Sequence, residues 1–540
     1  MTRRTLPDAF LSKLNEMNLT RLGDALAEGE PCVSVRLNPS RGVSEPDLPA
    51  EAEAVPWCRR GFYLAERPRF TFDPLLHQGG YYVQEASSMF HSHVAETLCR
   101  RMDSPLRVLD SCAAPGGKTT AVIDTLPEGS VMVANEYVPS RAAVLRENII
   151  KWGSPSTIVT RGDTAAFRKL KNCFDLIIAD VPCSGEGMMR KDPEAVAQWS
   201  EGLVRECAER QWMIVSNLWP ALKPGGCLIY STCTFNRTEN EEMVSRIIGE
   251  LGAESVAINI DPAWNIAPGI DTPHHCYRFM PDRLRGEGLF VAVVRKEGEW
   301  RPDSAPSPRS SKSKSKPSPL LKEAAAWLSP EWSEKMDLYA EDDRISAFPT
   351  AHSDLLKKVK RELDVIHEGV LLATVKGRDL IPSQSLALSH ALSPSTFPLC
   401  PVDRTQALAY LSGEALTLPD DTPRSFVLLE YSGRPLGFVK NLGRRSNNLY
   451  PAPWRIKTKL FHNFTLNIIR KLAYILRSCI ALIDNESGML LRYLCATSCT
   501  TLKTCILNKL CCKISFRSFK CASGTRILKW LLLPSLSCQL

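Results

Sequence analysis

The sequence predicts an α/β protein whose core is a doubly wound, Rossmann-like sheet. From about residue 105 to 297, apolar strand-like runs alternate with helix-length segments, a pattern typical of a mostly parallel sheet. A glycine-rich turn at 110–119 follows the first run and opens a helix, and Cys183 and Cys233 each follow a later run. Ligands bind such sheets outside the carboxyl ends of the strands, so we expect the turn and both cysteines around one crevice. The resulting hypothesis is a thiol nucleophile beside a nucleotide-sized cofactor.

The expected parallel strands are short apolar runs separated by helix-length segments. They are 106–110, 131–135, 157–160, 176–180 and 227–231. Residues 140–152 and 202–222 are among the expected helices between them. Two later runs, 277–281 and 289–296, are separated by a glycine-containing turn and predict a hairpin at the edge of the sheet.

A chain of 540 residues is too long for one core, and changes in composition divide it into segments. The expected segments are a mixed N-terminal segment at 1–95, the α/β domain at 96–297, a linker at 298–319, an α+β domain at 320–457 and a tail at 458–540. The linker is rich in Pro, Ser and basic residues, so we expect it to be disordered. In the N-terminal segment, Asp8 is a candidate cap of the first helix, and 31–38 alternates like a half-buried strand.

The net charge of +8 comes from the tail. Of the 67 Lys and Arg and the 59 Asp and Glu, 12 and 2 lie beyond residue 457, so 1–457 holds 55 basic and 57 acidic residues. The tail also holds 8 of the 19 cysteines, none in a C-x-x-C pair with zinc-site spacing. A degenerate or frame-shifted extension, a basic RNA-contacting arm and a metal-binding tail are the three interpretations. Nucleic-acid binding by 1–457 must come from local clustering of charge.

The composition, 44% hydrophobic and 23% charged, is that of an ordinary soluble globular protein. The N-terminus lacks the apolar core of a signal peptide, and no apolar run approaches the roughly 20 residues of a membrane span. We therefore expect a cytoplasmic protein, without a membrane partner, whose cysteines are reduced thiols.

Residues 112–119 nearly match a phosphate-binding P-loop. That motif needs glycine at Cys112, and Pro115 stiffens the loop, so a nucleoside triphosphatase is disfavoured. The alternative is a loop that wraps an amino-acid-bearing adenosine cofactor at a helix N-terminus. Gly116 and Gly117 would allow close approach of the backbone, and Lys118 could meet a carboxylate. A purely structural strand-to-helix turn is the remaining interpretation.

Two acids follow the next strands. Glu136 ends the second strand, where a carboxylate can accept both ribose hydroxyls. Asp163 follows the third strand, where it could hydrogen-bond an adenine amino group. Taken alone, each acid could equally be a helix cap or a solvated loop residue. Their position after successive strands favours cofactor binding.

Three blocks carry a specific resemblance. Residues 110–119, 180–187 and 231–235 read DSCAAPGGKT, DVPCSGEG and STCTF. In this order they resemble the signature blocks of the Nol/Nop/Sun family of RNA cytosine-carbon-5 methyltransferases. Residues 192–193 and 239–241 fit the same pattern.

The resemblance extends beyond the α/β domain. Residues 77–88 resemble the family's junction before the catalytic domain. Residues 436–440 and 449–451 are similar to the bacterial RsmF-type 16S ribosomal RNA enzymes. The resemblance implies a PUA-like domain in 320–457 and RNA binding by that domain and by 1–95. The tail resembles nothing in the family.

The resemblance implies that the cofactor is S-adenosylmethionine and implies which residues bind it. The implied binding residues are Cys112, Ala113, Ala114, Pro115, Gly116, Gly117, Lys118, Glu136, Asp163 and Asp180. The family also implies that the thiolate of Cys233 adds to carbon 6 of the cytosine. Asp180 would hydrogen-bond the ring nitrogen and amino group, and Cys183 would take part in proton removal from carbon 5 and product release. A lone buried cysteine is usually inert, so these roles depend on the surrounding blocks.

The implied reaction needs an exposed base, so the target cytosine must be single-stranded or flipped out. We expect a monomeric enzyme acting on small-subunit ribosomal RNA. Transfer RNA and DNA are alternative substrates, and a non-catalytic ribosome-assembly factor is an alternative function. Arg190 and Lys191 are expected to meet phosphate or to be solvated loop charges. The Arg59–Leu64 segment suits nucleotide stacking, with a solvated edge as the alternative.

Overall fold

The computed structural model describes residues 4–102, 105–299, 319–457, 518–520 and 526–528. The chain divides into two compact units, 1–457 and 458–540. In the second unit, β23 (Ser518–Lys520) pairs antiparallel with β24 (Arg526–Leu528). The predicted linker and the predicted tail lie otherwise almost entirely outside the described residues.

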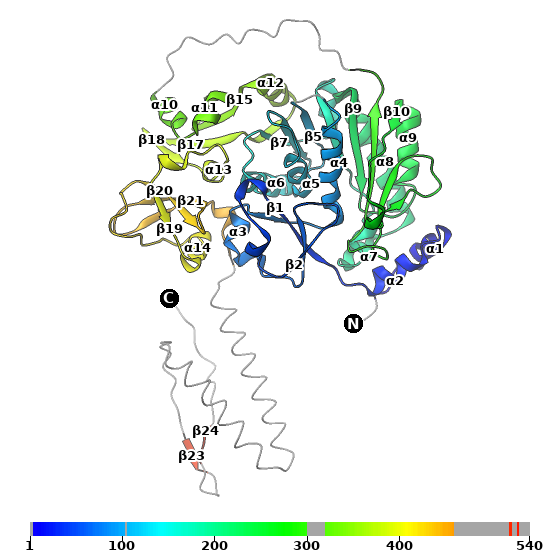
Figure 1. The fold of residues 1–540 in the computed structure, drawn as a ribbon, viewed down its shortest axis with the longest axis horizontal. Helices are drawn as coiled ribbons and strands as arrows, with labels where there is room; N and C mark the ends of the chain where they lie inside the picture. Colours follow the sequence, from blue (N-terminus) through cyan, green and yellow to red (C-terminus); the bar gives the residue numbers. More distant parts are fainter. Residues whose placement is uncertain (1–3, 103–104, 300–318, 458–517, 521–525, 529–540) are drawn as a thin grey trace. The chain divides into compact units, whose positions relative to one another are not determined.

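A mixed sheet forms the centre of the first unit (Figure 1). Its strand order is β11-β12-β13-β9-β8-β5-β6-β7-β16, and β10 pairs with β13. Strands β5 to β9 pair in parallel, whereas β13 runs antiparallel to β9. The bounds are β5 Arg107–Asp110, β6 Val131–Glu136, β7 Thr157–Arg161, β8 Phe174–Asp180, β9 Leu222–Thr232, β10 Ala253–Ser255, β11 Ala267–Pro268, β12 Cys276–Phe279, β13 Leu289–Lys296 and β16 Asp364–Glu368. The predicted doubly wound α/β fold is confirmed.

Helices cover both faces of this sheet, which explains the near-continuous apolar runs of its strands. They are α4 Phe90–Cys99, α5 Gly117–Ile123, α6 Pro139–Trp152, α7 Pro193–Gln198, α8 Glu201–Leu218 and α9 Glu241–Leu251. Neighbouring strand residues point to opposite faces: Val108 packs in the cluster that contains Phe90 of α4, and Leu109 packs in the cluster that contains Val215 of α8.

Two expected boundaries differ from the structure. Helix α8 ends at Leu218, four residues before the predicted end, because Pro220 has no backbone N–H to continue the helix. The predicted hairpin pairs as β12 with β13, but it is not the edge of the sheet. Strand β13 lies between β12 and β9, and β11 lies outside β12.

The N-terminal segment contains helices and a small sheet of order β2-β3-β1-β4. Its elements are α1 Asp8–Glu16, α2 Thr20–Glu28, β1 Val33–Leu37, β2 Ala52–Ala54, β3 Gly61–Leu64, α3 Pro74–His77 and β4 Tyr81–Val83. The predicted cap at Asp8 is wrong. Pro7 occupies the cap position, and Asp8 is the first helical residue, where its negative charge still favours the helix start.

The C-terminal segment contains two four-stranded sheets, β14-β15-β17-β18 and β19-β20-β21-β22. Its elements are α10 Pro319–Ala325, α11 Pro330–Lys335, β14 Met336–Glu341, β15 Arg344–Pro349, α12 Ser353–Glu362, β17 Val370–Lys376, β18 Asp379–Pro382, α13 Gln384–Ala387, β19 Leu399–Pro401, α14 Arg404–Leu411, β20 Phe426–Tyr431, β21 Arg434–Asn441 and β22 Ser446–Asn448. Between α12 and β17, β16 leaves this segment and pairs antiparallel with β7, so it covers an edge of the central sheet.

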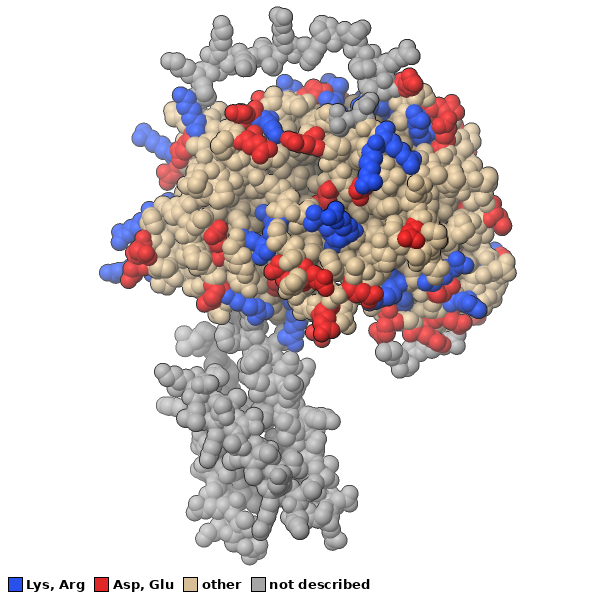
Figure 2. All heavy atoms as spheres, viewed as in Figure 1, with Lys and Arg blue, Asp and Glu red and all other residues tan. Residues whose placement is uncertain are grey.

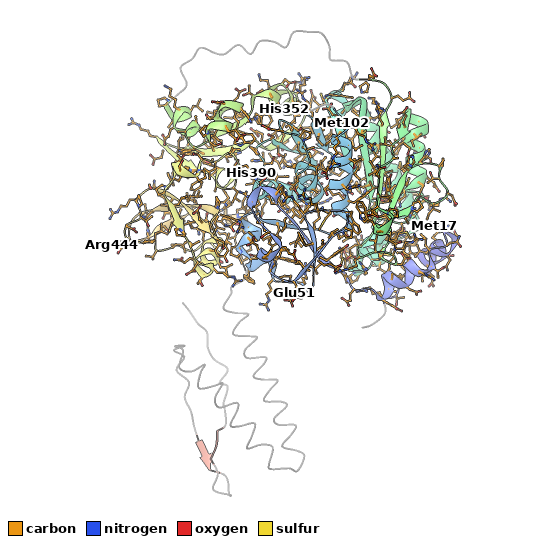
Figure 3. All side chains as sticks on the ribbon, viewed as in Figure 1. Met17, Glu51, Met102, His352, His390 and Arg444 are labelled. Carbon is orange, nitrogen blue, oxygen red and sulfur yellow. The ribbon has the colours of Figure 1, made fainter. Side chains whose placement is uncertain are left out.

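Polar contacts also join the C-terminal segment to the α/β domain. His352 and His390, both labelled in Figure 3, take part: the Nε2 atom of His352 lies 2.6 Å from the carbonyl of Gly129, and the backbone N–H of His390 donates to the carbonyl of Gly153 at 3.1 Å. Basic and acidic side chains are interspersed over the face in Figure 2, in keeping with their near balance in 1–457. No helix within the described ranges has the length and apolar character needed to cross a membrane.

Candidate active site at the carboxyl ends of β5, β8 and β9

The predicted cofactor turn joins β5 to α5. Gly116 has a φ of +111°, a left-handed conformation that favours glycine, and helix α5 begins at Gly117. A Cβ at Gly117 would lie only 3.3 Å from the ring of Tyr82. The carbonyl of Pro115 accepts hydrogen bonds from the Tyr82 hydroxyl at 3.0 Å and the Asn148 amide at 2.8 Å. Tyr82 and Asn148 therefore hold the turn in place through the Pro115 carbonyl. The backbone at Gly116 and Gly117 carries no side chain that would keep a ligand away.

Arg36 of β1 braces the helix that follows this turn. The side chain is buried, its guanidinium donates to Thr120 at 2.5 Å and also to Asp124, and it lies 4.5 Å from the centroid of the Trp152 ring. The N-terminal segment thus stabilises the position of α5. Sequence reasoning missed this arginine, although a cation between the apolar Val35 and Leu37 of a strand is a signal of a paired buried charge.

Both predicted acids stand at the ends of successive strands. Glu136 ends β6, is buried, and accepts a hydrogen bond from the N–H of Val138 at 2.9 Å. Asp163 follows β7, is exposed, and accepts from the N–H of Ala165 at 2.8 Å, so it caps a short 3-10 helix. The capping interpretation therefore also describes Asp163. The roles of both acids toward a cofactor stay predictions.

The two cysteines lie side by side. The Sγ atoms of Cys183 and Cys233 are 3.2 Å apart, and the N–H of Cys233 donates to the sulfur of Cys183 at 3.3 Å. The hydrogen bond from Cys183 lowers the pKa of the Cys233 thiol, and the same bond raises the pKa of Cys183 well above its usual value. Burial raises the pKa of Cys112, the thiol in the cofactor turn, to about 12. Of these three thiols, Cys233 is the one that forms a thiolate most easily.

Asp180, at the end of β8, is held from two sides. Lys118 donates to one carboxylate oxygen at 2.8 Å, and the Ser231 hydroxyl donates to the other at 2.7 Å. Burial alone would raise the pKa of Asp180, but Lys118 and these hydrogen bonds lower it overall. The partner of Lys118 in this structure is Asp180. The predicted contact between Lys118 and a cofactor carboxylate stays a prediction.

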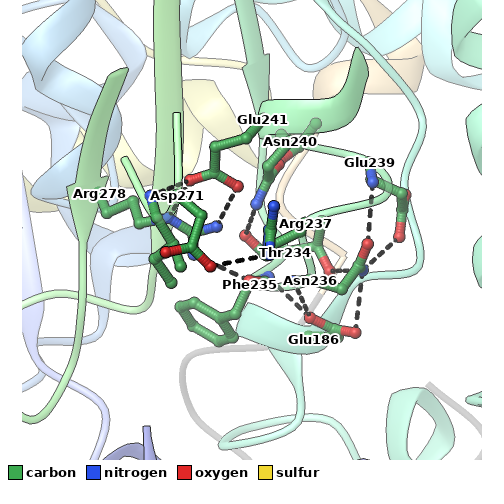
Figure 4. A network of polar contacts seen from close by, with 12 residues as sticks. Glu186, Thr234, Phe235, Asn236, Arg237, Glu239, Asn240, Glu241, Asp271 and Arg278 are labelled. Carbon is green, nitrogen blue, oxygen red and sulfur yellow. Dashed lines mark hydrogen bonds and ion pairs between the residues drawn. The ribbon is translucent and has the colours of Figure 1, made fainter. Parts of the chain in front are cut away.

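Two buried glutamates hold the loop that carries Cys233 (Figure 4). Glu186 accepts from the N–H groups of Phe235 at 2.7 Å and Asn236 at 3.0 Å, and from the indole of Trp199 at 2.9 Å. The Asn236 amide bridges Glu186 at 3.0 Å and Glu239 at 2.8 Å. Because Glu186 comes from the loop of Cys183, these bonds join the two cysteine loops.

Further contacts fix these loops to helix α8 and to strand β12. Glu239 accepts from the N–H of Ser184 at 3.0 Å and from the Gln211 amide of α8 at 2.7 Å. On the other side, Arg278 of β12 pairs with Glu241 at 2.5 Å and donates to the carbonyl of Phe235 at 2.8 Å. Figure 4 shows this second pair beside the first network. In the sequence, residues 186 and 239–241 were recognisable only as parts of motifs.

Arg190 is buried, although a surface position was expected. Its guanidinium forms an ion pair with Glu287 at 3.1 Å and donates a hydrogen bond to the carbonyl of Gly286 at 2.5 Å. The prediction of phosphate contact, and its solvated alternative, are wrong for this residue. Lys191 lies 3.9 Å from the same glutamate and its side chain is 35% exposed, so only Lys191 of the two can reach a ligand from outside.

The sequence matches known families over most of the first unit. Residues 100–295 match the model of the 16S rRNA methyltransferase RsmB/F, residues 6–86 the N-terminal domain of 16S rRNA methyltransferase RsmF, and residues 398–456 the RsmF PUA domain. The ribosomal RNA small subunit methyltransferase F of Enterobacter sp. (strain 638) is 32% identical over 468 residues, which cover 82% of this chain and 95% of the relative. The chain belongs to the RsmF family.

A second relative agrees with this membership. The methyltransferase F of Erwinia tasmaniensis is 32% identical over 423 residues, covering 75% of this chain and 86% of the relative. A solved methyltransferase homologue from Pyrococcus horikoshii is 24% identical with a TM-score of 0.44, over 54% of this chain and all of that one. The predicted Nol/Nop/Sun resemblance is confirmed, and the chain is a methyltransferase of small-subunit ribosomal RNA.

The cofactor is S-adenosylmethionine, as predicted. The turn fits an adenosine cofactor that carries an amino acid: its two glycines admit close approach, and the buried carboxylate of Glu136 ends the neighbouring strand. The individual binding roles of residues 112–118, Glu136, Asp163 and Asp180 stay predictions. The boundaries predicted for the five segments of the chain also stay predictions.

Proposed function

We propose that this RsmF enzyme methylates carbon 5 of a cytosine in small-subunit ribosomal RNA through a covalent adduct between Cys233 and carbon 6. The observation that carries the proposal is the pair of thiols, 3.2 Å apart, just after the strand ends where Asp180 of β8 pairs with Ser231 of β9. Carbon 5 of cytosine is a poor nucleophile, and addition of a thiolate to carbon 6 makes it a good one. S-adenosylmethionine, when bound by the turn, supplies the electrophilic methyl group.

Cys233 has the properties of the attacking group. Its thiolate is favoured by the hydrogen bond from Cys183, and Lys118 acts in the same direction. Attack forms the bond between sulfur and carbon 6 and moves an electron pair into the ring toward its nitrogen. Asp180 is the group expected to meet that nitrogen and the adjacent amino group, where the charge develops.

Cys183 is assigned to the second half of the reaction. After methylation, carbon 5 must lose its proton and the bond from carbon 6 to the Cys233 sulfur must break. Cys183 lies against that sulfur, so it is placed to assist both events. The raised pKa of its thiol means that the Cys183 thiolate, once formed, is a strong base that takes up a proton readily.

The target base must leave its stack to reach two half-buried thiols. The substrate is proposed to be small-subunit ribosomal RNA because the matched relatives carry that substrate in their names. RNA contacts are proposed for the N-terminal segment and for the region that matches the RsmF PUA domain.

Bisulfite sequencing of ribosomal RNA tests the proposal, because 5-methylcytosine resists bisulfite conversion. Cells that lack the gene should lose one or more resistant cytosines of the small subunit. Complementation with the wild type or with Cys173→Ala should restore them, since Cys173 is a buried thiol next to the amino end of β8. Cys233→Ala should restore none. Resistant cytosines in cells that carry only Cys233→Ala would contradict the covalent mechanism.

A further inference from the structure

The two loops that carry Cys183 and Cys233 run side by side beyond the contact between their sulfurs. The next residues along the loops, Ser184 and Thr234, have hydroxyl oxygens 2.8 Å apart. The backbone N–H of Gly187 donates to the carbonyl of Cys233 at 2.9 Å, and a Cβ at position 187 would lie only 2.8 Å from that carbonyl oxygen. The close approach of the loops therefore depends on a glycine and on polar contacts as well as on the two thiols.

This arrangement suits the formation of a disulfide. The Sγ atoms are 3.2 Å apart, and a disulfide bond is about 2.0 Å long. The loops leave β8 and β9, which are adjacent parallel strands with Asp180 opposite Ser231. Adjacent strands lie about 4.8 Å apart, within the range of roughly 4.4–6.8 Å between the Cα atoms of a disulfide. Small movements of the two side chains can therefore bring the sulfurs to bonding distance. Among the cysteines of the described ranges, no other two sulfurs form a hydrogen bond.

Cys233 is also the thiol on which oxidation should begin. The hydrogen bond from Cys183 lowers its pKa, and the thiolate is the form that reacts with peroxides. Both thiols are half-buried, and the proposed reaction needs a path wide enough for a cytosine, so a small hydroperoxide can reach them. Burial raises the pKa of Cys112, the thiol of the cofactor turn, to about 12, so this thiol stays protonated and reacts slowly.

We propose that Cys183 and Cys233 form a reversible disulfide that switches the enzyme off in the presence of a hydroperoxide. The bond itself follows from the geometry of the two loops, and the loss of activity rests on the proposed function. With the disulfide closed, Cys233 cannot add to carbon 6 and Cys183 cannot assist release. The cofactor turn at 112–118 contributes no atom to the bond, so the affinity for S-adenosylmethionine should be the same in both forms.

Closure of the disulfide passes two electrons from the sulfurs to the hydroperoxide. The Cys233 thiolate attacks one oxygen, so a sulfur–oxygen bond forms, the oxygen–oxygen bond breaks, and an alkoxide or hydroxide leaves. The Cys183 sulfur then attacks the oxidised sulfur of Cys233. The sulfur–sulfur bond forms, the sulfur–oxygen bond breaks, and the hydroxyl group leaves as water with the proton of the Cys183 thiol. A dithiol such as dithiothreitol returns both electrons through a mixed disulfide.

The position of Cys183 decides what happens to an oxidised Cys233. A sulfenic acid with no thiol beside it is oxidised further to a sulfinic acid, which dithiols do not reduce. Cys183 already lies against the Cys233 sulfur, so its attack competes well with a second peroxide molecule from solution. Closure of the disulfide therefore protects the nucleophile while it stops the reaction.

The test treats the full-length enzyme with hydrogen peroxide, blocks free thiols, and maps its tryptic peptides by mass spectrometry. Cleavage after Lys and Arg, but not before Pro, gives peptides 172–190 and 211–237, which carry Cys183 and Cys233. We expect the two peptides to be linked, with a mass lower than their sum by two hydrogen atoms. Methylation should fall in proportion to the linked fraction, and dithiothreitol should separate the peptides and restore activity. Calorimetry should give equal affinities for S-adenosylmethionine before and after oxidation.

Each of these peptides holds a second cysteine, which provides matched controls. Cys173 shares a peptide with Cys183, and Cys227 shares one with Cys233; both are buried. The double variant Cys173→Ala/Cys227→Ala should still form the link, and fragment spectra of the wild type locate the bond if that variant does not fold. Cys183→Ala should form no link, and its Cys233 should instead gain two oxygen atoms that dithiothreitol does not remove. A Cys233 that dithiothreitol recovers as fully in Cys183→Ala as in the wild type would overturn the role of Cys183.

The same experiment distinguishes the two proposals. A peroxide-treated wild type without linked peptides, or one linked through Cys173 or Cys227, would overturn the disulfide and leave the proposed function intact. Linked Cys183 and Cys233 with undiminished methylation would overturn the off-switch and would also contradict the assignment of Cys233 as the nucleophile.

Discussion

The Sγ atoms of Cys183 and Cys233 lie 3.2 Å apart although 50 residues separate them in the sequence. Strands β8 and β9 pair in parallel with Asp180 opposite Ser231, so residues that follow the two strand ends meet at the same edge of the sheet. One sulfur donates and the other accepts, which makes the two thiols chemically unequal. Substitutions of the two cysteines should therefore have different effects.

Cys183→Ala should accumulate a covalent complex with RNA, because addition by Cys233 remains possible while release is impaired. Cys233→Ala should form no complex and give no methylation. A denaturing gel of enzyme incubated with RNA and S-adenosylmethionine shows the adduct as a slower band. Cys173→Ala serves as the control for loss of a buried thiol. An adduct with Cys233→Ala, and none with Cys183→Ala, would reverse the two assignments.

Glu186→Ala should loosen the loop that carries Cys233. The substitution leaves the N–H groups of Phe235 and Asn236 and the indole of Trp199 without their acceptor. One unpaired buried donor costs about 1–3 kcal/mol, so the melting temperature and kcat should both fall. Glu186→Gln should recover part of each, since one amide oxygen still accepts.

The exposed Glu194 of α7 provides the control for this change. Glu194→Ala removes the same side chain from the surface and should leave the melting temperature and kcat near wild type. A Glu186→Ala enzyme with unchanged melting temperature and kcat would show that the network does not hold the loop.

The cofactor assignment of Asp163 is tested against its role as a cap. Asp163→Ala should weaken S-adenosylmethionine binding by about 1.5–3 kcal/mol, or roughly ten- to a hundredfold in Kd, as for loss of a charged hydrogen bond. Asp261→Ala is a matched control, because Asp261 is also exposed and caps a 3-10 helix through the N–H of Ala263 at 2.9 Å. Calorimetry measures both. Equal, wild-type affinities would remove Asp163 from the cofactor site.

Sequence patterns were sufficient for the parts of this fold that depend on local signals. The apolar runs and the glycine turn predicted the parallel strands, and the parallel order brought Cys183 and Cys233 to one edge. Long-range pairings had no such signal. Strand β16 joins β7 from beyond the linker, and its residues alternate no differently from those of an ordinary strand.

The buried polar groups of the site were also invisible in the sequence. Arg190 was read as a surface cation because its partner, Glu287, lies 97 residues further along the chain. His91 and Ser231 are 140 residues apart, and neither residue type by itself indicates that the two side chains are in contact. Charge and residue type are local properties, whereas burial and pairing depend on which segments pack together.

The tail, 458–540, holds 12 basic and 2 acidic residues, in contrast to the near balance of charge in 1–457. The first unit ends at Lys457, and the match to the RsmF PUA domain ends at residue 456. A chain that ends at Lys457 should therefore fold, bind S-adenosylmethionine and methylate its RNA at nearly the full rate. Thermal unfolding, calorimetry and turnover at saturating RNA measure these properties against the full-length chain.

The salt dependence of RNA binding separates the remaining interpretations of the tail. If the tail is an RNA-contacting arm, the shortened chain should bind RNA more weakly and with a flatter salt dependence, because each lost phosphate contact removes about one unit of slope. A metal-binding tail should show bound metal in mass spectrometry of the intact protein. An equal slope and affinity in both chains, without metal, is the result expected of a degenerate extension. Loss of turnover at saturating RNA in the shortened chain would contradict the view that the catalytic machinery is complete by residue 457.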